Sequence, residues 1–186
     1  NGAGGNLKLA SGESAVESSG AIDIWTATSP HGTGGLSLTT GQSTSGVAGS
    51  IEIAGGSSMN RVSSSVRIAA GSGSADGGDV SMSAGRGAHD GLGGSISVTA
   101  GASESAGGTV SLTSGESTAR TGDIRIWSPS ADGSSGGVRF ATGNAKHAEA
   151  GSVFTVAGDG VTGGSISLAA GSSSDTFSGG ALNMRA

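Results

Sequence analysis

Apolar and polar residues alternate in short blocks along the whole chain. Each block starts with a small residue, usually glycine, and continues polar, apolar, polar, apolar, as in GSISV from Gly94 and GTVSL from Gly108. This period-two alternation is typical of a β-strand that buries one face. The blocks, called copies from here on, are 13 in number over the 186 residues, with a mean step of about 14.6 residues (175 residues in 12 steps). They start at Gly5, Gly20, Gly34, Gly49, Ser64, Gly78, Gly94, Gly108, Gly122, Gly136, Gly151, Gly164 and Gly180.

Three inward positions follow each start, two, four and six residues later. The first is always aliphatic: Leu7, Ile22, Leu36, Ile51, Val66, Val80, Ile96, Val110, Ile124, Val138, Val153, Ile166 and Leu182. The second is large and apolar except at Thr155: Leu9, Ile24, Leu38, Ile53, Ile68, Met82, Val98, Leu112, Ile126, Phe140, Leu168 and Met184. The third is always small: Ser11, Thr26, Thr40, Gly55, Ala70, Ala84, Ala100, Ser114, Ser128, Thr142, Ala157, Ala170 and Ala186. Glycine often follows it, where we expect a turn with positive φ.

No single copy can bury its own apolar face, whereas stacked copies can. The pattern therefore predicts an all-β chain, a β-solenoid (a parallel β-helix-like stack) of about 13 copies of a 14–15-residue strand-turn repeat. A Greek-key sandwich is the structural alternative. One copy per coil would juxtapose two opposite-charge pairs and one like-charge pair (Lys8 with Asp23, Glu52 with Arg67, Arg125 with Arg139). Because so short a coil leaves little room for a core with Met82 and Phe140, we expect two copies per coil.

A longer repeat lies above the short one. GGNLKLASGESAVESSGAIDIW, which ends at Trp25, matches GGTVSLTSGESTARTGDIRIW, which ends at Trp127. Seven copies separate the two tryptophans and thus form one larger unit. We expect a single array over residues 1–186, with superrepeats at approximately 4–106 and 107–186, the second incomplete.

Composition narrows the function classes. The net charge of −5 has no block of like charge, which argues against nucleic-acid binding through phosphate contacts. No apolar run approaches the roughly 18 residues that span a membrane. The chain has no cysteine, which excludes disulfides and thiolate metal sites.

Residues that could carry chemistry are few and scattered. His31, His89 and His147 are evenly spaced, four copies apart, so we expect a row along one edge. Neighbours in such a row are at least about 10 Å apart, too far to share a metal ion, so solvated loop histidines are the simpler interpretation. GDGVTG at 158–163 matches the dinucleotide motif G-x-G-x-x-G but precedes another predicted strand instead of a helix. We expect no enzyme and no catalytic, cofactor-binding or metal-binding residues.

Trp25 and Trp127 occupy outward positions five residues after their starts. Exposed tryptophans favour a partner contact, because aromatic side chains are enriched at protein interfaces. A loop folded back over the ring is the alternative. Ice binding on a flat face is the weaker hypothesis, since the outward threonines do not persist from copy to copy.

The repeat pattern in GGSISVTAGAS and GGTVSLTSGES resembles that of the Gly/Ser-rich repeat proteins of algae and related protists. Those proteins form extracellular surfaces or filaments such as flagellar hairs. The resemblance implies a secreted structural protein with O-linked glycans on serine and threonine. The first and last copies carry no evident cap, and open sheet edges recruit further strands. We therefore expect a structural module of an extracellular fibre, filament or surface layer, assembling end to end or laterally by self-association or with other chains of a filament. The alternative is a binding module, ice-binding or a carbohydrate-binding adhesin.

Overall fold

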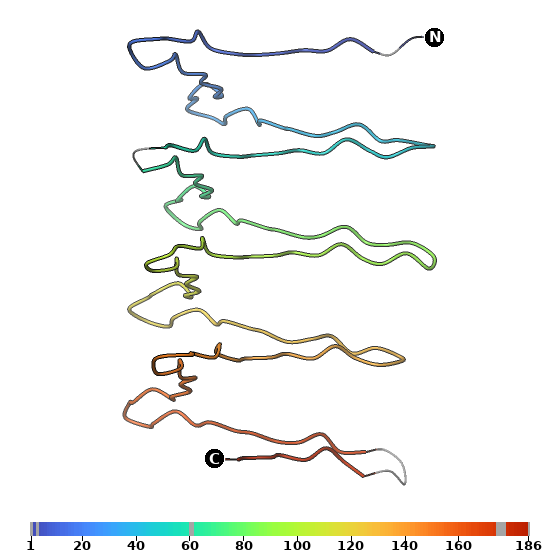
Figure 1. The fold of residues 1–186 in the computed structure, drawn as a ribbon, viewed down its shortest axis with the longest axis vertical. Coiled ribbons are helices and arrows are strands. Elements are labelled where there is room, and N and C mark those ends of the chain that lie inside the picture. The colour runs from blue at the N-terminus through green and yellow to red at the C-terminus, as the bar shows by residue number, and fades with distance from the viewer. Residues whose placement is uncertain (1, 3, 60–61, 174–177, 186) are drawn as a thin grey trace. The chain divides into compact units, whose positions relative to one another are not determined.

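The computed structural model describes residues 2, 4–59, 62–173 and 178–185, and within these ranges the chain forms no helix and no strand. It divides into two units, Asn1–Ser95 and Ile96–Ala186. In each unit the copies are extended segments joined by loops (Figure 1). The backbone bends once per copy in the described ranges, at residues 15–17, 30–31, 44–46, 59, 74–75, 89–90, 104–105, 118–119, 132–133, 146–148 and 160–162. The predicted period of the copies is therefore the period of the backbone.

The predicted β-solenoid is wrong for this chain. A solenoid needs backbone hydrogen bonds between stacked coils, at a spacing of about 4.8 Å. In the described part of the chain, every backbone–backbone hydrogen bond lies within one loop, and none joins the extended segments to one another. The alternation specifies an extended conformation and a sidedness, but a ladder also needs a neighbouring strand, and no other segment of this chain provides it.

The chain also lacks a core. None of the described residues is buried, and its accessible surface is 18871 Å². A folded monomer of 17.3 kDa exposes about 7,800 Å² and an unfolded chain of that mass about 25,000 Å². This conformation therefore leaves roughly 11,000 Å² more surface in water than a folded monomer does. Hydrophobic burial within one chain is too small to offset the entropy cost of ordering it.

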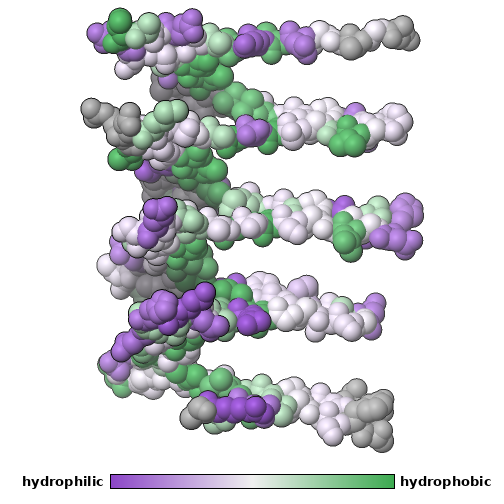
Figure 2. All heavy atoms as spheres, in the orientation of Figure 1, coloured by the Kyte–Doolittle hydropathy of each residue, from purple (hydrophilic) through white to green (hydrophobic). Residues whose placement is uncertain are grey.

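The extended segments nevertheless have a consistent inner side. At the first inward position the side chains are 47–61% exposed, apart from Leu7, whereas apolar side chains in the loops, such as Val16, Val47 and Val161, are more than 90% exposed. Figure 2 shows the hydrophobic residues gathered along the inner part of the copies in each unit and hydrophilic ones toward the loops. The predicted inward positions thus lie on one side, and that side is uncovered.

Ten of the loops are closed at their base by a recurrent hydrogen bond, and the loops that end at Gly34 and Gly49 are not. The starting residue of one copy donates its N–H to the carbonyl oxygen seven residues after the preceding start, at 2.8–3.3 Å. The pairs are Gly20 with Gly12, Ser64 with Gly56, Gly78 with Gly71, Gly94 with Gly85, Gly108 with Gly101, Gly122 with Gly115, Gly164 with Gly158 and Gly180 with Gly171. Ser128 Oγ and Thr142 Oγ1 donate instead to the Gly136 and Gly151 carbonyls, at 2.7 and 3.0 Å. The loops are therefore ordered locally, as hairpin-like arms.

The expected positive-φ turns are also wrong. Among the described residues no glycine has a positive φ, and His89, with φ 54°, is the one non-glycine residue that does. Glycine serves close approach instead, at the start of eleven of the copies. A Cβ added to the starting glycine at eleven junctions would lie 3.3–3.8 Å from the side chain of the third inward residue before it. The small third position and the starting glycine therefore form the base of each arm.

At least two arms depend on a glycine for backbone room: a Cβ on Gly73 would meet the Asp76 carbonyl oxygen, and the second case is Gly87. A Cβ on Gly87 would meet the carbonyl oxygens of Gly91 and Leu92, whereas a Cβ on Gly85 meets nothing within 4 Å. We predict that Gly87→Ala opens this arm and speeds tryptic cleavage after Arg86 several-fold, and that Gly85→Ala does not. Limited proteolysis followed by mass spectrometry measures both rates, and equal rates would show that the arm is already open.

Candidate interaction surface

Inward and outward side chains of three consecutive copies in unit 2 surround one hollow. It measures about 970 Å³ and is lined by Ile96 and Val98 from one copy, Leu112 from the next, and Arg125, Ile126 and Trp127 from the third. Three consecutive copies of this unit thus face one hollow. The expected two copies per coil are wrong together with the solenoid, because no strands pair into coils in the described residues. The lining side chains remain exposed, so this chain does not fill the hollow that it surrounds.

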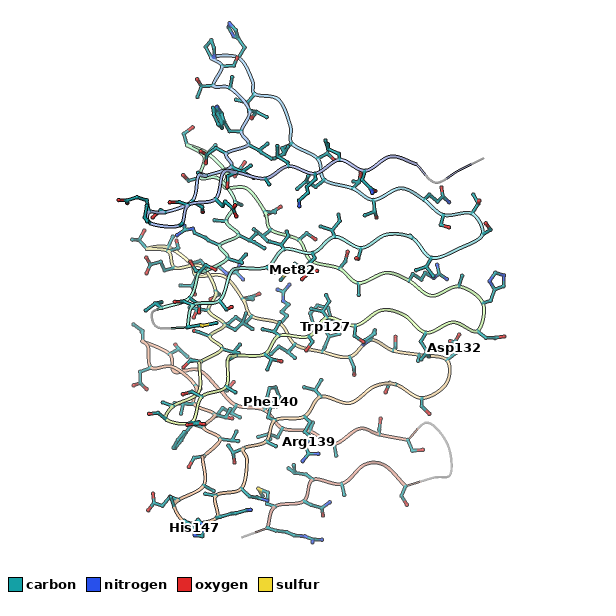
Figure 3. All side chains as sticks on the ribbon, turned by 45° about the horizontal axis from the view of Figure 1, so that its top comes forward. Met82, Trp127, Asp132, Arg139, Phe140 and His147 are labelled. Atoms are coloured by element: carbon teal, nitrogen blue, oxygen red, sulfur yellow. The ribbon has the colours of Figure 1, made fainter. Side chains whose placement is uncertain are left out.

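The arms between the copies leave in different directions. In unit 2, Asp132 and His147 lie in successive arms and point to opposite sides of the view, while Trp127 and Phe140 lie nearer the middle of the unit (Figure 3). In unit 1, the arms at 44–46 and 89–90, three copies apart, extend to the same side in Figure 1, and open space separates them in Figure 2. Arms therefore recur in direction every third copy within this unit.

Trp25 and Trp127 are 77% and 70% exposed, and their predicted outward orientation stays a prediction, because the inward residues Leu9 and Met82 are both 70% exposed as well. Trp127 also borders the hollow, beside Arg125. Arg125 forms an ion pair with Asp123, with Nη2 to Oδ2 at 2.5 Å. The partner contact at both tryptophans stays a prediction, because no partner chain is present.

We predict that Trp127→Ala weakens assembly of this chain at least tenfold, because an aromatic side chain buried at an interface contributes about 2–4 kcal/mol. The control is Val161→Ala, in an exposed arm of the same unit. Sedimentation across a concentration series measures the midpoint of assembly. An unchanged midpoint for Trp127→Ala would exclude the contact.

The three histidines lie in exposed arms. His31 donates its backbone N–H to Ser29 Oγ at 3.3 Å, His89 lies in the turn at 89–90, and His147 lies in the bend at 146–148. In the part of the chain that the structure describes, no three His, Cys, Asp or Glu residues come together as a metal site. The common row of histidines stays a prediction.

The motif at residues 158–163 forms an ordinary arm. The N–H of Gly164 donates to the Gly158 carbonyl oxygen at 2.9 Å, as at the other arm bases. A dinucleotide site needs a helix N-terminus for the pyrophosphate. An extended segment follows here instead.

Two features were missed in the sequence. The first is the contact between the third inward residue and the next start. The sequence contains a sign of this contact at one junction. There the third inward residue is glycine, Gly55, and the following start is the larger Ser64, whereas at the other junctions the start is the glycine. The second is a serine nine residues after the start, whose Oγ accepts N–H groups within its arm and fixes the turn. These serines are Ser14, Ser29, Ser43, Ser103 and Ser117.

Comparison with protein-family models, curated protein sequences and solved structures finds no match for this chain. In the described ranges no helix is long and apolar enough to cross a membrane. The interaction surface is therefore defined by its own geometry: unpaired extended segments, an exposed apolar inner side and locally closed arms.

Proposed function

We propose that this chain is a structural component of an extracellular fibre, filament or surface layer, and that it acquires its stable form only by association. The observation that carries the proposal is the uncovered inner side of the copies: no described residue is buried, although the first two inward positions are apolar in every copy except at Thr155. A soluble monomer does not retain so continuous an apolar surface.

The unpaired backbone supports the same proposal. Extended segments with free N–H and C=O groups recruit further strands, and burial without such partners costs several kcal/mol per group. Association satisfies these groups and covers the apolar side at the same time. Repetition along the chain then makes the association continuous, as a fibre requires.

An extracellular location is supported by the resemblance of the Gly/Ser cadence to surface and filament proteins of algae and protists. O-linked glycans on arm serines and threonines would be compatible with it, because the arms project into solvent.

Negative-stain microscopy of the native material, with an antibody against this chain, tests the function. We expect labelled fibres or sheets in which the label repeats along the length. Discrete short rods without fibres, or labelled soluble particles alone, would contradict the proposal.

A further inference from the structure

The extended segments need strand neighbours on both edges. The order of large and small side chains along each segment indicates which strands can be those neighbours. Between the starting residue and the third inward position, no described residue makes a backbone–backbone hydrogen bond. Every copy has the same spacing of large apolar and small residues, so another copy is the segment that matches each one best. Since no copy of the same chain lies alongside, the matching segment must come from a second chain.

The three-copy turn fixes the number of chains. Homo-oligomers close by point-group symmetry, and chains that share one axis are related by a rotation about it. A turn of three copies is indicated by the arms that recur in direction every third copy in unit 1 (Figure 1) and by the three consecutive copies around the hollow in unit 2. Such a turn is mapped onto itself by rotations of 120° and not of 180° or 90°. We infer that three copies of this chain wind around one common axis, each supplying the strands that the other two lack. This inference rests on the proposed structural function, whose self-association it specifies.

The inferred arrangement has a defined register. Each copy rises by one strand spacing of about 4.8 Å, so one turn of a chain rises by about 14 Å, and the strands of the two other chains fill the interval. Each copy of one chain then has two strand neighbours. One is the copy that comes one earlier in the sequence, from the second chain, and the other is the copy that comes one later, from the third chain. Each layer of the core contains the same inward side chain three times, once from each chain.

The charges agree with this register. Consecutive copies of different chains place Lys8 beside Asp23 and Glu52 beside Arg67, which is favourable across neighbouring strands. The one like-charge juxtaposition, Arg125 with Arg139, involves the arginine that Asp123 already pairs. The register therefore places one like-charge pair at the middle outward position, with one carboxylate, Asp123, beside it.

The tryptophans agree as well. At the outward position of Trp127, the preceding and following copies carry Thr113 and Ala141, and at that of Trp25 they carry Ala10 and Thr39. Small residues on both sides give each indole room to lie across its neighbours. Because arms four copies apart fall on different sides of a three-copy turn, His31, His89 and His147 do not form a single row in this arrangement.

The uncovered area agrees with intertwined chains and not with a simple contact. A standard interface buries about 800 Å² per partner. This chain exposes roughly 11,000 Å² more than a folded monomer of its mass. Only an interface along the whole length of every chain can cover an area of that size.

Sedimentation equilibrium and native mass spectrometry of the chain test the number. We expect a particle with three times the chain mass of 17.3 kDa, and a β-sheet circular dichroism spectrum that is lost on dissociation. A β-rich monomer, a dimer or a tetramer would overturn the inference, and so would a chain without β signal at every concentration.

Engineered disulfides test the register, since the chain has no cysteine of its own. Ser97→Cys with Ser111→Cys places one cysteine in each of two consecutive copies, at the same outward position. Adjacent strands bring their Cα atoms within the disulfide reach of roughly 4.4–6.8 Å. Mild oxidation should therefore link three chains covalently on a denaturing gel.

The matched control is Ser81→Cys with Ser111→Cys, two layers or about 10 Å apart, which should stay unlinked. Disulfides within single chains, or equal linking of both pairs, would overturn the register. Covalent trimers in material that forms no fibres would refute the proposed function and leave the inference standing. Labelled fibres built from chains that never link as trimers would refute the inference and leave the proposed function standing.

Discussion

Val110→Asp is expected to abolish assembly of the chain. Val110 occupies a first inward position and is 59% exposed in the single chain, so this chain alone predicts a near-neutral substitution. In the three-chain arrangement the change removes three buried aliphatic side chains from one layer, each worth about 1.5–3 kcal/mol. It also places three carboxylates together in an apolar core, where an unpaired charge is far more costly than a lost methyl group. The β signal and the trimeric species should both disappear, as measured by circular dichroism and sedimentation.

The matched control is Ser111→Asp, one residue further on the outward side. We expect it to assemble like the unaltered chain, because its carboxylate stays in water. If Val110→Asp assembled equally well, the inner side would not be an interface, and both the proposed function and the trimer would lose their main support.

Gly55→Ala is expected to destabilise the assembly by about 1–2 kcal/mol per chain. A trimer contains the substitution three times, so the three contributions add. Here the third inward residue is glycine and the following start is Ser64, the reverse of the other junctions. Ser64 Oγ donates to the Gly56 carbonyl oxygen at 2.9 Å, and a Cβ on Gly55 would occupy the space of that hydroxyl. The midpoint of thermal dissociation should fall by several degrees.

The double variant Gly55→Ala/Ser64→Gly should recover most of the lost stability, because it recreates the Ala–Gly arrangement found at Ala70 and Gly78. The double-mutant cycle then gives a coupling energy of about 0.5–3 kcal/mol. Additive effects of the two substitutions would show that the junction contact does not form in the assembled protein.

Local conformation was predictable to a large extent. The period of the copies and the side to which the inward residues point follow from period-two alternation, which is a property of consecutive residues. The positions of the arms were predictable as turns, but the role of glycine in them was not. Glycine was expected for positive φ, whereas Gly78 and Gly94 provide close approach to Ala70 and Ala84.

The pairing of the copies was not predictable. The alternation around Ile96, Val110 and Ile124 is the same whether the neighbouring strand belongs to this chain or to another. A solenoid of two copies per coil was the economical assumption, because it buries the inward residues within one molecule. The number of copies that surround the hollow depends on how far each arm turns the chain, and no residue pattern reports that angle.

The sequence by itself thus determined the repeat, its apolar side and its lack of a conventional active-site or metal-binding motif. Only the tertiary structure decided that most arms are closed by the chain itself and that, in the described ranges, the extended segments have no strand partner. The physical reason is that sidedness is encoded residue by residue, whereas strand pairing depends on what lies about 4.8 Å away in space. Among the residues that the structure describes, no segment of the same chain is hydrogen-bonded at that position.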